Sequence, residues 1–162
     1  MSGYNSFMQY LIPPHGPRSS LALLVLRIVT GWAFILHGSM KLGDPMHWAS
    51  QALPGAPGWL QMIVVLAEFG GGFLLVVGLF TPLVAFLLAC DMTVAIFAVH
   101  IPKGGHFVGG PLAFELPLLY LCLMLAFLLT GPGSYSIDAQ IAARFARLPR
   151  QTSQPKLFEK AA

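Results

Sequence analysis

The chain has 162 residues, of which 56% are hydrophobic and only 9% are charged, and its formal net charge is +3. Soluble domains usually carry about 25% charged residues, so this composition excludes an ordinary soluble domain and predicts an integral membrane protein. The small positive charge lies mainly near the C-terminus and argues against nucleic acid as a partner. The cysteines, Cys90 and Cys122, lie inside apolar runs, which argues against a secreted disulfide framework and favours two buried thiols over a thiol pair.

The distribution of apolar residues predicts four membrane-spanning helices. Residues 1–20 form a polar to mixed N-terminal segment, in which three prolines oppose a long helix and a serine can cap the first span. Each apolar segment that follows is close to the ~20 residues that cross ~30 Å of hydrocarbon. We therefore predict an all-α fold, a four-helix bundle integral to the membrane. It occupies residues 21–131, with spans near residues 21–41, 59–80, 83–101 and 111–130.

After the fourth span, residues 132–148 contain the turn GPGSYSID and a short helix that Ser136 or Asp138 can cap. Apolar residues recur at helical spacing in this segment, with arginines among them, which predicts an interfacial amphipathic helix on a lipid surface. Residues 149–162 are predicted to form a disordered basic tail.

Lysine and arginine residues precede the first span and follow the fourth, whereas the loops after the first and third spans hold few. By the positive-inside rule, this distribution predicts a multi-pass protein of a bacterial-type cytoplasmic (inner) membrane with both termini cytoplasmic.

The first span carries three side chains that do not belong in lipid: Arg27, His37 and Lys41. At 100° per residue they fall within about 80° of one helix face. This face must therefore meet polar partners elsewhere in the chain.

The candidate partners are acidic residues inside other spans. At 1.5 Å per residue, Glu68 and Asp91 lie near mid-membrane, and Arg27 lies on the inner side of them. An unpaired charge at the bilayer centre costs at least ~2.5–3.5 kcal/mol on insertion scales, so we expect these three residues to converge. They either hold the helices together or form the bottom of a polar pocket that opens outward. The predicted rim of that pocket is His37, Lys41, His100 and Glu115.

Glycine and proline positions add two local predictions. The triple glycine 70–72 next to Glu68 serves either close helix packing or the lining of a site. Pro117 frees a backbone carbonyl and is expected to kink the fourth span, which would tilt Glu115 toward the bundle.

Several motifs together resemble the DoxX family of small four-helix membrane proteins. They are HGSMKL (37–42) after Arg27 in the first span, AEFGGGFLLVVGLFTP (67–82), Glu115 and GPGSYSID (131–138). The better-described members are similar to quinone-linked oxidoreductase subunits or to components of complexes that cope with thiol or radical stress. The resemblance therefore implies an oxidoreductase component whose electrons pass through a soluble or membrane redox partner or a diffusible quinone.

The favoured hypothesis is a membrane oxidoreductase component that binds a quinone or a small anion. Glu68, Asp91 and His37 are its candidate catalytic residues, and Arg27, Lys41, His100 and Glu115 are its candidate ligand-binding residues. Haem or a metal is the less favoured cofactor, because no closed ligand set is evident. The alternatives are a small transporter for an anion or proton, which would need a homo-oligomer, and a scaffold that docks a soluble redox enzyme.

Overall fold

The computed structural model describes residues 15–147, and this part of the chain is helical with connecting loops, which confirms the predicted all-α four-helix fold. Two short segments are π-helical and are marked η. In chain order the elements are α2 (Pro17–Ser39), α3 (Gly58–Val65), η1 (Leu66–Gly70), α4 (Gly71–Val77), α5 (Thr81–Val94), η2 (Ala95–His100), α6 (Glu115–Thr130) and α7 (Ile137–Arg147).

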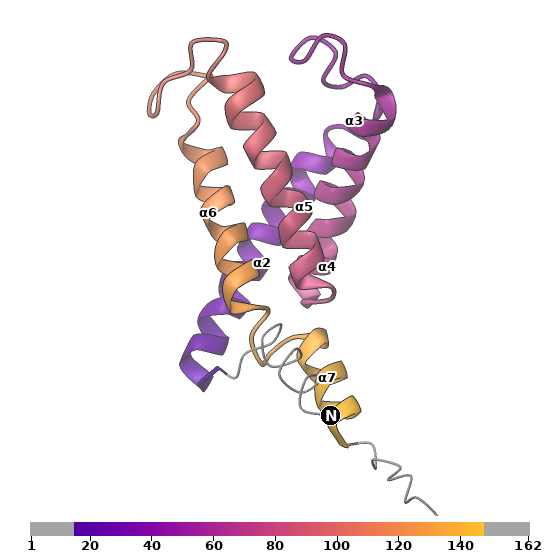
Figure 1. Ribbon diagram of the computed structural model, residues 1–162, viewed down its shortest axis with the longest axis vertical. Coiled ribbons are helices and arrows are strands. Elements are labelled where there is room, and N and C mark those ends of the chain that lie inside the picture. Colours follow the sequence, from indigo (N-terminus) through magenta and orange to yellow (C-terminus); the bar gives the residue numbers. More distant parts are fainter. Residues whose placement is uncertain (1–14, 148–162) are drawn as a thin grey trace, which may run out of the picture.

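These elements form four rods, because α3, η1 and α4 are continuous and α5 runs directly into η2. The rod of α2 packs against α4 and η1, and α5 packs against α6 (Figure 1). Loops 40–57 and 101–114 lie at the top of Figure 1, which we call the loop end. The turn between α4 and α5, the end of α6 and helix α7 lie at the bottom, which we call the turn end.

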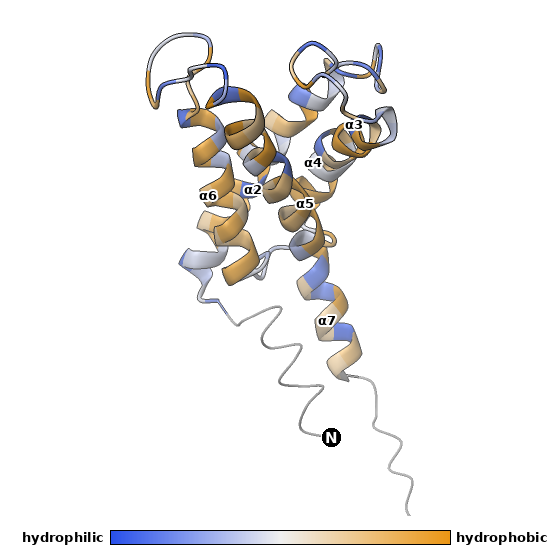
Figure 2. Ribbon diagram, turned by 45° about the horizontal axis from the view of Figure 1, so that its top comes forward, coloured by the Kyte–Doolittle hydropathy of each residue, from blue (hydrophilic) through white to orange (hydrophobic). Residues whose placement is uncertain are grey.

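Three of the rods are long and apolar enough to cross a membrane: Pro17–Ser39, Gly58–Val77 and Thr81–His100. Their outward surfaces are mostly hydrophobic, whereas polar residues gather in the loops and on α7 (Figure 2). Helix α6 is apolar but shorter, with 16 residues, or ~24 Å of helix. The predicted start of the fourth span at residue 111 is therefore wrong, since Gly109 and Gly110 have positive φ angles and residues 111–114 form an irregular approach to α6.

The predicted kink at Pro117 is also wrong, because α6 begins only two residues earlier, at Glu115. Pro117 lies in the first turn of the helix, where its missing N–H would have no intrahelical partner and its fixed φ is compatible with the helix. Helix α2 likewise begins earlier than residue 21, with Pro17 in its first turn. Ser20 is therefore inside the helix, and its hydroxyl bonds that of Ser134 at 3.0 Å instead of capping the span.

Glycines allow α2 to approach the second rod closely. A Cβ atom on Gly31 would lie 2.7 Å from the carbonyl oxygen of Gly72, and one on Gly38 would lie 2.5 Å from the backbone nitrogen of Phe69. Both separations are too short for a side chain, so backbone packs directly on backbone. Of the triple glycine, Gly72 serves this contact, whereas a Cβ on Gly70 would meet open space.

The residues after α6 bind the turn between α4 and α5. The Asp138 carboxylate accepts the backbone N–H groups of Phe80 at 2.8 Å and Thr81 at 2.9 Å, at the first turn of α5. Its own backbone N–H donates to the carbonyl of Gly78 at 2.9 Å. Asp138 therefore caps α5, whereas Ser136 caps α7 by accepting the N–H of Ala139 at 3.1 Å.

Gly38→Ala should lower the free energy of unfolding by about 1–3 kcal/mol, because the new methyl group overpacks the contact with Phe69. Gly70→Ala is the matched control and should be neutral or slightly stabilising, since alanine is the better helix former. Denaturant titration of each variant in detergent, followed by circular dichroism, measures the difference. Equal effects of the two substitutions would contradict the assigned packing.

Asp138→Ala should destabilise the fold by about 1–2 kcal/mol, because two N–H groups of α5 lose their cap. Asp44→Ala is the control, since the Asp44 side chain is 64% exposed and pairs only with the exposed His47. The same titration compares both variants, and a cost no larger than that of Asp44→Ala would argue against the capping role.

Candidate functional site

One ion pair lies between the end of α2 and η1, about halfway along the second rod. The ammonium group of Lys41, just beyond α2, lies 2.5 Å from Oε2 of Glu68 in η1, and the two side chains are 18% and 4% exposed. The nearest charged groups to Asp91 in α5 are these same two residues. Three elements therefore contribute one cation and two carboxyl groups to a single cluster.

Loop 40–57 folds back over this cluster. The Lys41 ammonium lies 3.9 Å from the centre of the Trp48 ring, a cation–π contact. The Trp48 indole N–H donates to the carbonyl oxygen of Gln61 at 3.2 Å. The Gln61 side chain is buried and accepts the N–H of Ala49 at 2.8 Å while donating to the carbonyl of Ala56 at 3.0 Å. These contacts hold Trp48 in place beside the ion pair.

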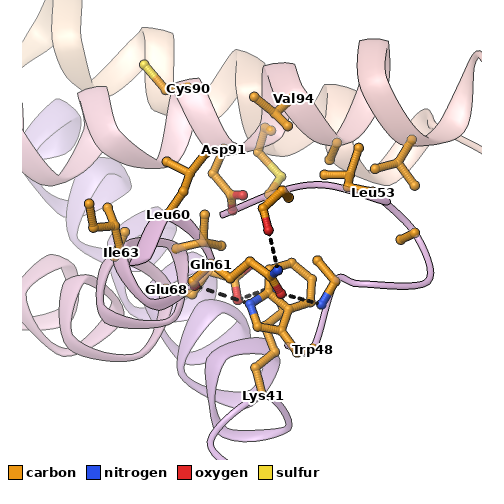
Figure 3. Close-up of a pocket in the computed structure, with 18 of the residues that line it drawn as sticks. Lys41, Trp48, Leu53, Leu60, Gln61, Ile63, Glu68, Cys90, Asp91 and Val94 are labelled. Atoms are coloured by element: carbon orange, nitrogen blue, oxygen red, sulfur yellow. Dashed lines mark hydrogen bonds and ion pairs between the residues drawn. The ribbon is translucent and has the colours of Figure 1, made fainter. Parts of the chain in front are cut away.

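The cluster lines a cavity of about 410 Å³ between the second and third rods. This volume lies within the ~300–1,000 Å³ typical of small-molecule sites. Figure 3 shows Glu68 and Asp91 approaching each other across the cavity, with Lys41 and Trp48 below them. Most of the remaining lining is aliphatic, including Leu60, Ile63, Leu87, Met92 and Val94.

Both walls of the cavity contain a π-helical segment. Glu68 lies inside η1, and His100 is the last residue of η2, so each wall turns a polar side chain inward where the helical hydrogen bonding changes. Such segments occur frequently at functional sites, because the extra residue in the turn re-aims the side chains that follow.

His100 lies at the loop end of the cavity. Its Nδ1 is 2.9 Å from the carbonyl oxygen of Leu112, and because a carbonyl only accepts, Nδ1 donates this bond. The other ring nitrogen, Nε2, is then the acceptor in a neutral imidazole. Of the predicted site residues, the structure brings Lys41, Glu68, Asp91 and His100 to the lining of one cavity.

The predicted convergence of Arg27 with Glu68 and Asp91 is wrong. Arg27 is fully buried at the turn end, where its Nη2 donates to the backbone carbonyl of Tyr135, and its nearest acidic group is Asp138. Fourteen residues, or ~21 Å of helix, separate it from Lys41. Glu68 instead takes its cation from Lys41, because the end of α2 packs against η1.

Two further candidates lie outside the cavity lining. His37 is half-buried on α2, with its ring 6.3 Å from that of Tyr120 in an edge-on arrangement. Glu115 is exposed at the first turn of α6. Neither residue lines the cavity, so the structure does not bring His37 or Glu115 to the cluster.

Trp48 and Gln61 were not among the candidate residues, although both are part of the site. Gln61 carries a recognisable pattern, a polar side chain in the first turns of an otherwise apolar span. Trp48 lies in an irregular loop with no periodicity to assign its direction, so only the folded loop reveals its contact with Lys41.

Cys90 and Cys122 are both free thiols, and Cys90 lies at the cavity lining. Within residues 15–147, no group of three or more histidine, cysteine, aspartate or glutamate side chains is arranged to hold a metal ion.

Comparison with known proteins matches the chain to one family of membrane proteins. The family model DoxX matches residues 22–101. An uncharacterized protein of Haemophilus influenzae is 39% identical over 119 residues, covering 72% of this chain and 87% of the relative. The inner membrane protein YqjF of Escherichia coli is 32% identical over 124 residues, covering 73% of this chain and 90% of the relative. No solved structure matches the chain.

Lys41→Met should destabilise the protein by about 3–5 kcal/mol, because it leaves two buried carboxyl groups without a cation. The double variant Lys41→Met/Glu68→Gln should recover most of that loss, since it removes the stranded charge as well. Unfolding in detergent measures both variants. If the double variant is no more stable than Lys41→Met alone, Lys41 does not stabilise the fold by compensating the charge of Glu68.

Proposed function

Because the chain belongs to the DoxX family of membrane proteins, we propose that it is the quinone-binding component of a membrane oxidoreductase. Its ligand site is the cavity at Lys41, Glu68 and Asp91. The observation that carries the proposal is the cluster of one cation and two carboxyl groups on the wall of an otherwise aliphatic cavity inside the membrane.

The charge count of the cluster explains why it suits proton-coupled chemistry. Lys41 neutralises Glu68, and Asp91 then remains as a second carboxyl group with no cation of its own. An uncompensated charge inside the bilayer is expensive, so a neutral cluster requires one proton on the carboxyl groups. The Oε2 atom of Glu68 and the Oδ2 atom of Asp91 are both buried without a hydrogen-bond partner among the described residues. Because Lys41 forms its ion pair with Glu68, we assign the proton that is exchanged with the ligand to Asp91.

A quinone and its reduced quinol match the two states of this carboxyl group. Protonated Asp91 donates a hydrogen bond to a quinone carbonyl, and ionised Asp91 accepts one from a quinol hydroxyl. Reduction of a quinone takes up two electrons and two protons. Asp91 supplies the proton to one ring oxygen and is reprotonated by water from the loop end, which also supplies the proton to the second ring oxygen. A redox partner protein, soluble or membrane-bound, supplies the electrons.

The same charge count argues against a small anion as the ligand. The positive charge of Lys41 is already shared between Glu68 and the Trp48 ring, and the second carboxyl group would repel an anion. Transport across the membrane also needs a path beyond the cluster. Toward the turn end, the bundle core is closed by side chains that are at most 1% exposed: Phe34, Leu75, Leu88, Met124 and Phe127.

The proposed setting is the cytoplasmic membrane, with the turn end and both termini facing the cytoplasm. The name of the relative from Escherichia coli supports the inner membrane. The positive-inside distribution of lysine and arginine supports the orientation. In this orientation α7 lies on the inner leaflet, with Ile141 and Phe145 toward lipid and Arg144 near anionic headgroups.

Quinone binding can be measured with Trp48 as the reporter. In a Trp32→Phe/Trp59→Phe background, Trp48 is the remaining tryptophan, and a quinone in the cavity should quench its fluorescence. Asp91→Leu should weaken the binding of tetramethylbenzoquinone by about tenfold or more, because it removes the carboxyl group that donates to the ring oxygen. Glu68→Gln should also weaken it, because Lys41 is then free to pair with an ionised Asp91, which cannot donate. Asp44→Asn, in the exposed part of loop 40–57, is the control and should bind the quinone as the parent protein does.

The same variants distinguish the remaining alternatives. If folded Asp91→Leu and Glu68→Gln bind the quinone as the parent does, the proposed site is wrong and the scaffold hypothesis is favoured. Flux of protons or anions in proteoliposomes, without quinone binding, would instead support a transporter.

A further inference from the structure

The cavity has an opening that faces the hydrocarbon of the membrane. Four of its lining residues are also among the exposed hydrophobic residues of the membrane-spanning rods. On the second rod these are Leu60 and Ile63, which are 44% and 43% exposed, and on the third rod they are Leu87 and Val94, which are 38% and 49% exposed. A side chain that touches both the cavity and the outside marks the mouth of the cavity, so the mouth lies between α3 and α5.

The position of these residues along the helices sets the depth of the mouth. Ile63 lies five residues beyond the start of the second rod at Gly58, or ~8 Å along the helix. Leu87 lies six residues from the turn-end start of the third rod at Thr81, or ~9 Å along it. The mouth therefore extends from near the loop end past the middle of the membrane, where the surrounding medium is lipid chains rather than water.

Asp91 lies on the same face of α5 as the mouth residues Leu87 and Val94, which are four residues before it and three residues after it. The charged cluster and the apolar mouth therefore adjoin each other in one cavity. Glu68 is ten residues, or ~15 Å, beyond Gly58, so the charged cluster also lies near mid-membrane. Water-facing loop 40–57 is pinned over the cluster by Trp48 and Gln61. The aqueous side is thus covered by contacts, whereas the lipid side carries aliphatic side chains and the exposed Cys90 thiol.

We infer that the cavity takes its ligand sideways from the bilayer, and that the ligand is a quinone with an apolar chain that remains in the mouth between α3 and α5. The inference rests on the proposed function and adds to it the ligand class and the route of entry. The ring lies against Asp91 and Glu68, and the chain leaves between Ile63 and Val94 into the surrounding lipid. A ligand without a chain fills only the polar part of the cavity.

The test compares two quinones in proteoliposomes, with Trp48 as the reporter in the Trp32→Phe/Trp59→Phe background. One probe is tetramethylbenzoquinone, and the other is trimethylbenzoquinone that carries a decyl chain. Ile63→Phe/Val94→Phe narrows the mouth without touching the charged cluster. It should weaken binding of the decyl probe by about tenfold or more, because a filled passage cannot accommodate the chain, and leave the chainless probe within about twofold.

The matched control is Val25→Phe/Val29→Phe, which adds the same ring to residues of α2 that are 52% and 64% exposed and do not line the cavity. It should leave the affinity of both probes within about twofold. If Ile63→Phe/Val94→Phe binds the decyl probe as tightly as the control does, the chain leaves elsewhere and the inference is overturned.

A second measurement does not depend on these variants folding. A photoreactive diazirine at the end of the decyl chain should label residues 58–65 and 87–94 of the parent protein, and unlabelled decyl quinone should compete. Labelling confined to loop 40–57 or to α6 would overturn lateral entry while leaving quinone binding intact. If neither probe quenches Trp48 in the parent, the proposed function and the inference fail together.

Discussion

The ion pair between Lys41 and Glu68 is the interaction on which the loop end of this bundle depends. It joins the end of α2 to η1 in a medium where neither charge can be left alone. Loop 40–57 starts from that pair and returns to it, because the Trp48 ring covers the Lys41 ammonium and hydrogen-bonds to Gln61. The pair thereby places the loop, orients Glu68 toward the cavity and leaves Asp91 as the carboxyl group without its own cation.

A second polar cluster holds the opposite end. Arg27 is buried against the turn after α6, and Asp138 at the start of α7 caps α5, so all four rods meet there. Between the clusters the helices are joined by apolar side chains and by glycine contacts between α2 and the second rod. The rods diverge from the turn end toward the loop end (Figure 1), and the cavity lies between the second and third rods, away from the Arg27 cluster. The cluster that holds the rods together at the turn end and the cluster proposed to bind the ligand thus lie at different positions along the axis of the bundle.

Much of the site could be predicted from the apolar pattern alone. Glu68, Asp91, Lys41 and His100 stand out because each interrupts or borders a segment that should face lipid, and all four line the cavity. The pairing of Arg27 could not be predicted in the same way. Counting residues gave its depth, but the turn that provides its partner, Tyr135, lies outside the spans and accepts through a backbone carbonyl, which no residue type reveals.

The sequence by itself determined that this is a membrane protein of four apolar helices, since burying charged groups in lipid is costly and few are present. It also determined that the charges inside those helices need partners, and its motifs matched the family to which it belongs. Only the tertiary structure decided which charges pair, because depth along a helix does not specify the neighbouring face. The two π-helical segments changed those faces locally, and the irregular loop carried Trp48 to Lys41 through contacts that have no periodic pattern in the chain.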